Sequence, residues 1–226
     1  MDAAIVLRGI SLDPHYSFYH HLYVMEKLLL ASSSPRRKDL LESLGLDLTI
    51  IAPEVDEAGY DHLPPRERVI ALASLKARAI ASIAGPDEPR LVLGADTLVC
   101  VPVTLPSVHE EALGKPLNRG EAHRMIEMLS GREHYVHTGL ALIDRISGSE
   151  WTTRSDSIVS FSSMDEGEIR AYLDCQEWEG VAGAYRIQGR AAWFIERIEG
   201  SWSGIVGLPI RELYGILRSA DFRLGR

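Results

Sequence analysis

A short stretch near the start of the chain combines hydroxyls with positive charge: Ser32-Ser33-Ser34-Pro35-Arg36-Arg37-Lys38. Ser34 suits the N-cap of a helix and Pro35 its first position, so a helix should begin among these residues. Three cations in a first turn oppose the helix dipole by about 0.3–1 kcal/mol each, and stability alone would not select them. Free backbone N–H groups, hydroxyls and guanidinium groups together suit a polyphosphate. The alternative is a solvated helix start with ordinary surface arginines.

Lys76 is the second candidate, because it falls within an apolar stripe of the helix predicted over 64–84. The stripe is formed by Val69, Leu72, Ala73, Ile80 and Ile83. A lysine in such a position is costly unless it reaches solvent or meets an anion, and both interpretations remain open. The stripe also predicts that Lys76→Met weakens anion binding while leaving the protein equally stable or more stable.

Two acidic residues could supply carboxylates to the same site. Asp96 follows the apolar run 91–95, which is typical of a strand buried on both faces. We expect it at a strand end, where ligands of α/β proteins usually lie, and where it could hold a metal ion or accept a proton. Its ordinary alternative is a turn or N-cap aspartate. Glu57 could add a second carboxylate from a loop.

Several common site motifs are missing. Lys115, in Gly114-Lys115-Pro116, lacks the GxxxxGK[ST] frame of a nucleotide-binding P-loop. GxGxxG, HExxH and GxSxG do not occur, so dinucleotide oxidoreductases, zinc proteases and α/β-hydrolases have no motif support. His134 and His137 are three residues apart on a predicted strand, so they should point to opposite faces rather than form a metal pair.

Strands and helices that could position these residues alternate along the chain. Strands are predicted over 28–31, 46–52, 90–101, 135–144, 151–161, 184–188 and 192–198, and a polar loop over 102–113. Helices are predicted over 36–44, 64–84, 163–175 and 209–217. A further helix is predicted after its N-cap Asn118, with Glu121 at its third position, and it ends at Gly131. Ser163 and Glu166 form a capping-box pattern at the helix 163–175. Without a strict βαβ rhythm, the order predicts an α/β domain with a long mixed sheet.

Composition narrows the function classes. The chain has 226 residues, of which 46% are hydrophobic and 25% charged, as in globular proteins. Its net charge of −8 argues against binding to nucleic acid or to a membrane surface. No apolar run approaches the ~20 residues of a membrane span. Cys100 and Cys175 lack metal-binding spacing, which is typical of a reducing cytosol.

Taken in order, these motifs resemble the Maf family of nucleoside triphosphate pyrophosphatases. The similarity runs from about Lys27 to the last predicted helix. It rests on Leu30-Ala31-Ser32-Ser33-Ser34-Pro35-Arg36-Arg37, Asp56-Glu57, Lys76-Ala77, Gly94-Ala95-Asp96-Thr97, Gly114-Lys115-Pro116, Leu129-Ser130-Gly131, Ala182-Gly183-Ala184-Tyr185-Arg186-Ile187-Gln188-Gly189, Gly200-Ser201 and Val206-Gly207-Leu208-Pro209.

The resemblance implies a single α/β domain over 27–226, with a long mixed, twisted sheet flanked by helices around a substrate cleft, after an N-terminal extension over 1–26. It also implies cytoplasmic hydrolysis of a nucleoside triphosphate to the monophosphate and pyrophosphate, with Mg²⁺ or Mn²⁺. The family's usual state is a homodimer, and neither nucleic acid nor membrane is an expected partner.

By position, Asp96 matches the family's proton acceptor. The implied catalytic set is Asp96, Lys76, Lys115 and Glu57, with Glu57 and Asp96 on the metal ion. The implied substrate-binding set is Ser32, Ser34, Arg36, Arg37, Thr97 and Gln188, among which Arg36, Thr97 and Gln188 match specificity positions.

The form Tyr-x-Ile-Gln-Gly at 185–189 looks like the branch that acts on dTTP and UTP. Two alternatives remain: a pyrophosphatase for modified purines such as 7-methyl-GTP, and a nucleotide-binding inhibitor of septum formation with vestigial catalysis. The chain departs from the family in several places. Val181 stands where the family has a lysine, Trp202 replaces a tyrosine, and the segment 102–112 is longer than usual.

Overall fold

Three long antiparallel strands form the centre of the structure. The computed structural model describes residues 26–103 and 109–224. Its seven-stranded mixed sheet has the order β2-β1-β3-β5-β6-β7, with β4 paired to β3 off this path. The strands are β1 (Leu28–Ala31), β2 (Leu48–Ile50), β3 (Leu91–Val103), β4 (His109–Leu113), β5 (Glu133–Asp144), β6 (Glu150–Phe161) and β7 (Ile195–Glu199). β1 runs parallel to β2 and β3, whereas the other pairings are antiparallel.

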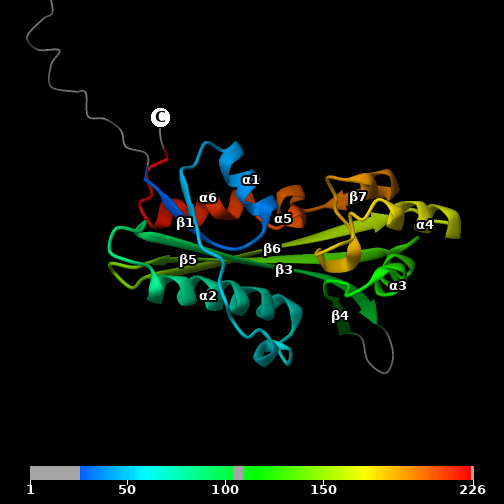
Figure 1. The fold of residues 1–226 in the computed structure, drawn as a ribbon, viewed down its shortest axis with the longest axis horizontal. Coiled ribbons are helices and arrows are strands. Elements are labelled where there is room, and N and C mark those ends of the chain that lie inside the picture. Colours follow the sequence, from blue (N-terminus) through cyan, green and yellow to red (C-terminus); the bar gives the residue numbers. More distant parts are fainter. Residues whose placement is uncertain (1–25, 104–108, 225–226) are drawn as a thin grey trace, which may run out of the picture.

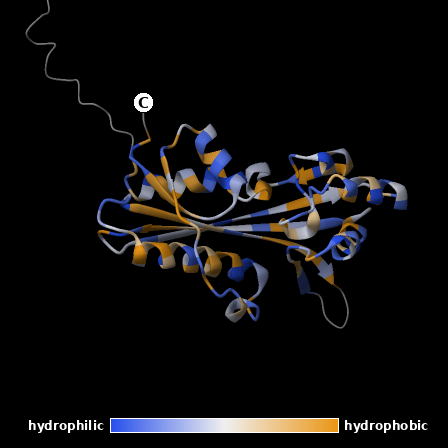
Figure 2. Ribbon diagram, viewed as in Figure 1, coloured by the Kyte–Doolittle hydropathy of each residue, from blue (hydrophilic) through white to orange (hydrophobic). Residues whose placement is uncertain are grey.

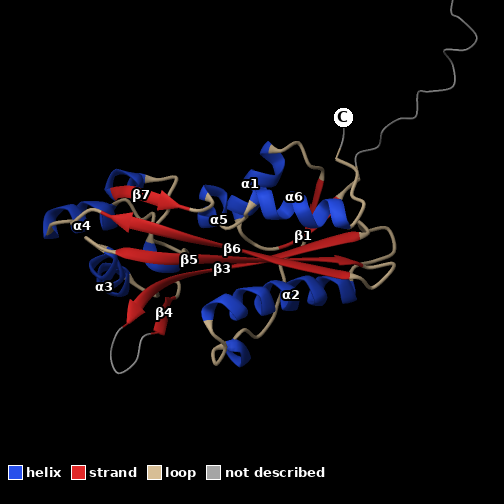
Figure 3. Ribbon diagram, turned by 180° about the vertical axis from the view of Figure 1, so that it is seen from behind, coloured by secondary structure: helices blue, strands red, loops and turns tan. Residues whose placement is uncertain are grey.

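Helices cover both faces of this sheet at one end of the long strands (Figure 1). α2 (Pro65–Ile83) lies along one face, and α1 (Pro35–Ser43), α5 (Trp202–Val206) and α6 (Ile210–Ser219) lie on the other. At the opposite end are α3 (Arg119–Leu129) and α4 (Glu166–Asp174), as the view from behind also shows (Figure 3). The predicted fold class is confirmed: a single α/β domain with a long mixed sheet flanked by helices.

The apolar run at the start of β3 reflects this double cover. Leu91 and Leu93 pack in the core beneath α6, while Val92 packs against α2 with Ala73, Ala77 and Ile80. Because successive strand residues point to opposite faces, a strand between two helix layers must be apolar throughout. The hydropathy colouring shows the strands most apolar where α2 and α6 flank them (Figure 2).

Glycines let α2 lie unusually close to the sheet. A Cβ at Gly94 would overlap the carbonyl oxygen of Ala73 and lie 2.9 Å from the Ala77 nitrogen. A Cβ at Gly139 would likewise overlap the Val69 carbonyl. The close contact brings the side chain of Lys76 against β3.

Two predicted strands in the last third of the chain are wrong or shifted. Residues 184–188 form no strand; the 3₁₀ helix η3 (Ala182–Ala184) leads into a turn, with positive φ at Gly183 and Ala184. Tyr185 and Ile187 are buried in this turn, and their alternation mimics a strand pattern. The strand expected at 192–198 begins later, at β7, because η4 (Arg190–Phe194) occupies its first half.

Other predicted elements differ from the structure at their boundaries and caps. The loop predicted over 102–113 instead contains the end of β3 and all of β4, although 104–108 lies outside the described residues. The capping box of α4 is formed by Asp165 and Glu168 rather than by Ser163 and Glu166. Asn118 caps α3 as predicted, accepting a hydrogen bond from the Glu121 N–H. The extension predicted over 1–26 lies almost wholly outside the described residues.

Both cysteines are free thiols. None of the helices within 26–103 and 109–224 is long and apolar enough to cross a membrane.

Candidate active site

A break in the strand pairing along one edge of β3 defines the site. β1 pairs with β3 as far as Ala31 opposite Gly94, and β4 begins on the same edge at Val99. Between them, residues 95–98 have no strand neighbour on that side within the described chain. Asp96 therefore lies in the middle of β3, not at its end as predicted, but directly beyond the carboxyl end of the parallel strand β1.

The break explains how consecutive residues reach one cavity. Asp96 and Thr97 point to opposite faces of the sheet. Because the edge between them is open, a cavity of about 260 Å³ reaches both. Every residue predicted for the site lines this cavity: Ser32, Ser34, Arg36, Arg37, Glu57, Lys76, Asp96, Thr97, Lys115 and Gln188. The structure thus brings together residues that lie up to 156 positions apart, from Ser32 to Gln188 (188 − 32).

The N-terminus of α1 supplies the cavity's basic wall. Arg37 is fixed by neutral partners: its Nε donates to the Gly207 carbonyl at 2.8 Å. Its two terminal nitrogens donate to the hydroxyls of Ser32 and Thr97, both at 3.1 Å. Burial lowers the pKa of the Arg37 guanidinium, and Asp96 acts against this effect. Among the described residues, no carboxylate directly contacts Arg37 to neutralise its charge, so this charge is available to an anion in the cavity.

Further cations line the cavity around Arg37. Burial lowers the pKa of Arg36, and the charge of Arg186 lowers it further. Lys115 is exposed at the rim. The third cation of the α1 motif, Lys38, instead pairs with Glu42 at 3.1 Å on the surface. Ser34 occupies the N-cap position, but its hydroxyl makes no capping hydrogen bond.

Lys76 meets two carboxylates rather than solvent. Its Nζ lies 2.6 Å from Asp96 Oδ1 and 2.9 Å from Glu57 Oε1, with 12% of the lysine side chain exposed. The close approach of α2 to β3 at Gly94 produces this contact. Lys76 therefore fixes the position of the Asp96 carboxylate.

The surroundings of the second carboxylate oxygen of Asp96 indicate whether the site suits a metal ion. Asp96 Oδ2 is buried and has no hydrogen-bond partner in the part of the chain that the structure describes. A buried carboxylate oxygen without a donor is costly unless water or a cation satisfies it. With Glu57 at the same ammonium, the two carboxylates provide the oxygen ligands that Mg²⁺ and Mn²⁺ prefer.

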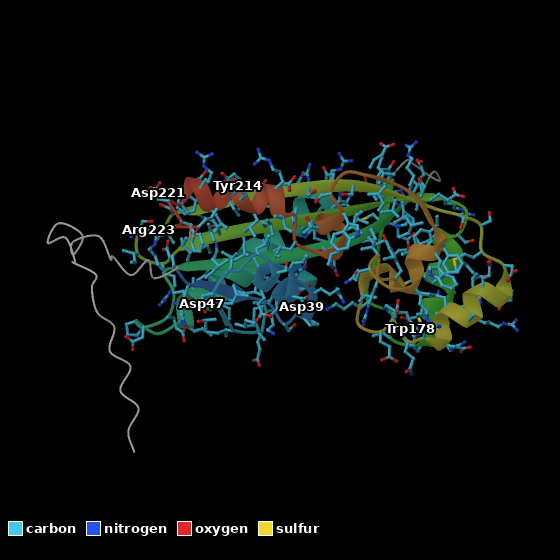
Figure 4. All side chains as sticks on the ribbon, turned by 90° about the horizontal axis from the view of Figure 1, so that it is seen from above. Asp39, Asp47, Trp178, Tyr214, Asp221 and Arg223 are labelled. Atoms are coloured by element: carbon cyan, nitrogen blue, oxygen red, sulfur yellow. The ribbon has the colours of Figure 1, made fainter. Side chains whose placement is uncertain are left out.

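The turn after η3 contributes residues that sequence reasoning missed as site residues. Arg186, Tyr185 and Ile187 line the cavity beside the predicted Gln188. Seen from above, Asp39 on α1 lies between Asp47 at one end of the molecule and Trp178 at the other (Figure 4). The turn after η3 follows Trp178 in the sequence. Two features of the sequence could have identified Arg186 as a site residue: its positive charge and its position within the motif at 182–189.

The buried ring of Tyr185 is held from behind by His134. The His134 Nε2 lies 2.9 Å from the Tyr185 hydroxyl, and both side chains are buried. Phe161 packs edge-on against both rings. Burial lowers the pKa of His134 to about 4, so the imidazole is neutral near pH 7.

Comparison with known proteins gives consistent matches. A family model described as Maf-like protein matches residues 27–220. A protein named dTTP/UTP pyrophosphatase from Treponema denticola is 42% identical over 202 residues, 88% of this chain and 100% of the relative. Another with that name, from Moorella thermoacetica, is 45% identical over 193 residues, 85% of this chain and 94% of the relative. A solved structure of a nucleoside-triphosphatase / dITP/XTP pyrophosphatase from Mycobacterium abscessus aligns at 16% identity over 61% of this chain and 75% of that chain, with a TM-score of 0.35.

Proposed function

The chain belongs to the Maf family, and from that premise we propose that it hydrolyses nucleoside triphosphates, foremost dTTP and UTP, to the monophosphate and pyrophosphate. The names of its relatives support this substrate class. The cavity supports it chemically, because it places cations from α1, the turn after η3 and the loop after β4 around two carboxylates. A triphosphate carries several negative charges, which this wall neutralises.

The single observation that carries the reaction is the buried Oδ2 of Asp96, which has no hydrogen-bond partner among the described residues. Lys76 holds Oδ1 at 2.6 Å, so Oδ2 is left for the reacting groups. We assign Asp96 as the base: a water oxygen bonds to the α-phosphorus, its proton passes to Oδ2, and the bond to the bridging oxygen breaks to release pyrophosphate. Lys76, Arg37 and Lys115 oppose the charge that develops on the phosphates.

Glu57 and Asp96 are the residues that would hold the divalent cation, Mg²⁺ or Mn²⁺. When bound there, such an ion neutralises phosphate charge and polarises the phosphoryl oxygens. The chain's own part is to present both carboxylates on one side of the cavity, with Lys76 between them.

Base preference is assigned to Gln188. Its side chain is exposed at the cavity, and its amide makes no hydrogen bond to any other described residue. An amide that offers both donors and an acceptor matches the alternating edge of uracil or thymine. Arg36 and Thr97 complete this part of the proposal, which also includes a cytoplasmic homodimer without nucleic-acid or membrane partners.

Pyrophosphate release from a panel of triphosphates in Mg²⁺ tests the function. Wild-type protein should turn over dTTP and UTP, and Asp96→Asn should lose more than about tenfold in kcat, or 1.4 kcal/mol of barrier. Asp39→Asn, an exposed acid on α1, is the matched control and should keep full activity. An Asp96→Asn rate within tenfold of wild type would remove Asp96 from the chemistry.

Val181 favours a second candidate, a nucleotide-binding protein without turnover. Its side chain is buried in the cavity wall at the position where the family carries a lysine. Wild-type protein that binds dTTP but releases no pyrophosphate would support this candidate. Turnover that Val181→Lys increases would instead show an active site lacking one cation.

A further inference from the structure

A second group of reactive side chains lies on the α2 face of the sheet, outside the cavity. Cys100, Glu110 and His137 come from β3, β4 and β5, and one ligand atom from each lies within 4.8 Å of the others. Strand register brings them together: Glu110 pairs with Pro102 and His137 with Leu98, on either side of Cys100. Residues directly paired in this way point to the same face.

His137 is fully buried between two carboxylates. Its Nδ1 lies 2.7 Å from Asp156 Oδ1, and its Nε2 lies 2.7 Å from Glu110 Oε2. Ionised carboxylates only accept hydrogen bonds, so a neutral imidazole can satisfy one of them and must point a lone pair at the other. Some cation therefore belongs between Nε2 and Glu110, and it is either a proton or a metal ion.

We propose that Cys100, Glu110 and His137 bind a thiophilic divalent cation of the Zn²⁺ class, with Asp156 orienting the His137 ring. The sulfur distinguishes this arrangement from a simple protonated histidine, because thiolate, imidazole and carboxylate together are the ligand set of Zn²⁺. Asp156 supplies the carboxylate that commonly holds the second nitrogen of a metal-binding histidine.

The surrounding charges support the orientation of these ligands. Arg154 donates to both oxygens of Asp156, at 2.8 and 3.0 Å, which fixes the carboxylate against His137. Arg66 lies 3.7 Å from the other oxygen of Glu110, and the charge of Arg68 acts to lower the pKa of the Cys100 thiol. With a thiolate, a carboxylate and a neutral imidazole, a bound Zn²⁺ gives a group of zero net charge, which these arginines do not repel.

Binding requires small movements and a balanced release of protons. Ligands on a tetrahedral Zn²⁺ lie about 2.0–2.3 Å from the ion, so nitrogen and oxygen separate to about 3.4 Å. Glu110, which is 22% exposed, must therefore move by under about 1 Å. Burial, followed by the charge of Glu110, raises the pKa of the Cys100 thiol to about 12. The metal displaces the thiol proton and the proton on Nε2, and both leave to solvent.

The consequence is a clamp between three strands. The ion would join the short edge strand β4 to β3 and β5 next to the point where the active-site break ends. This inference does not depend on the proposed hydrolysis, since none of its ligands lines the cavity.

Titration of chelator-treated, full-length protein with Co²⁺ tests the proposal, because a thiolate bound to Co²⁺ gives a charge-transfer absorption band. We expect the band to saturate at one ion per chain, to disappear in Cys100→Ala and to persist in Cys175→Ala, the matched control. Zn²⁺ should displace the Co²⁺ and raise the Tm of the wild type and of Cys175→Ala, the two proteins expected to show the band. A second candidate group on the surface, His123, Glu127 and Glu166, has no sulfur and cannot give the band.

Two further variants keep the test decisive if Cys100→Ala fails to fold. Glu110→Gln should abolish tight Co²⁺ binding, and Asp156→Asn should weaken it about 10–100-fold while leaving the band's shape unchanged. A wild-type protein that shows no band in excess Co²⁺ would mean that a proton lies between His137 and Glu110. A band that survives Cys100→Ala or is lost in Cys175→Ala would also overturn the assignment.

Discussion

Replacing Lys76 with methionine should destabilise the protein, although the apolar stripe around Lys76 predicts the opposite. In the structure, the Lys76 ammonium lies 2.6 Å from Asp96 Oδ1, and Asp96 is only 7% exposed. Methionine fits the stripe but leaves the Asp96 charge buried without a partner. The sign of the effect therefore depends on the carboxylates and not on the helix.

The magnitude follows from the contact. At 2.6 Å and an effective dielectric constant of about 20, the attraction between the two charges is about 6 kcal/mol, much of which offsets their desolvation. Removing one partner of a buried pair usually costs about 3–5 kcal/mol. Because the pair borders a cavity that admits water, we expect about 2–3 kcal/mol. For a chain of this size, that loss lowers the Tm by about 4–12 °C.

Urea unfolding of four proteins measures this cost: wild type, Lys76→Met, Asp96→Asn and the double variant. The double variant lacks both charges of this pair, so its loss of stability should be smaller than the sum of the two single losses by about 1–3 kcal/mol. Lys38→Met is the matched control, because its exposed pair with Glu42 contributes under about 1 kcal/mol. If Lys76→Met is as stable as wild type, or if the effects simply add, the pair is screened by water and the reasoning fails.

Three other expectations follow from the structure. Gly94→Ala should lower the free energy of unfolding in urea by about 1–3 kcal/mol, because the new Cβ would overlap the Ala73 carbonyl. Gly215→Ala, on the open surface of α6, should raise it by about 0.5–1 kcal/mol, and equal effects would refute the close contact. Because burial lowers the pKa of His134 to about 4, the unfolded chain takes up a proton that the folded chain does not, and the free energy of unfolding should fall as the pH drops from about 6.5 to 4. The slope reaches about 1.4 kcal/mol per pH unit, and a His134→Gln protein with the same slope would show that another group titrates. We expect the wild type to prefer dTTP and UTP over ATP by at least about tenfold in kcat/KM. Gln188→Ala should reduce this preference more than it lowers the rate on the best substrate, and an unchanged ranking would assign base selection to Arg36 and Thr97.

Local sequence signals marked part of the cavity, whereas Thr97, Lys115 and Gln188 were predicted only from the family resemblance. Arg37 was marked by its position against a helix dipole, Lys76 by its place in an apolar stripe, and Asp96 by the buried run before it. The long strands and the helices α2 and α3 followed from periodicity and caps. Each of these signals lies within a few residues of the side chain that it concerns.

What the sequence could not supply depends on pairing between distant strands. The open edge at 95–98 exists because β1 ends and β4 begins at particular registers, which no local pattern encodes. The turn at 184–188 was mistaken for a strand because buried residues alternate there for reasons of tertiary packing. His134 and His137 do face opposite sides, but the hydrogen-bond partners of His137 come from two other strands, β4 and β6, and were not foreseen.

The short open edge of β3 also bears on solubility. An unpaired strand edge is a template on which another chain can add a strand and aggregate. Over residues 95–98 this edge is only about 13 Å long, at about 3.3 Å per residue, and β1 and β4 close it at both ends. An incoming strand would collide with these two neighbours before it could pair. The chain can therefore leave backbone groups of a central strand open to a small ligand while denying them to other copies of itself, even when substitutions remove the site's charges.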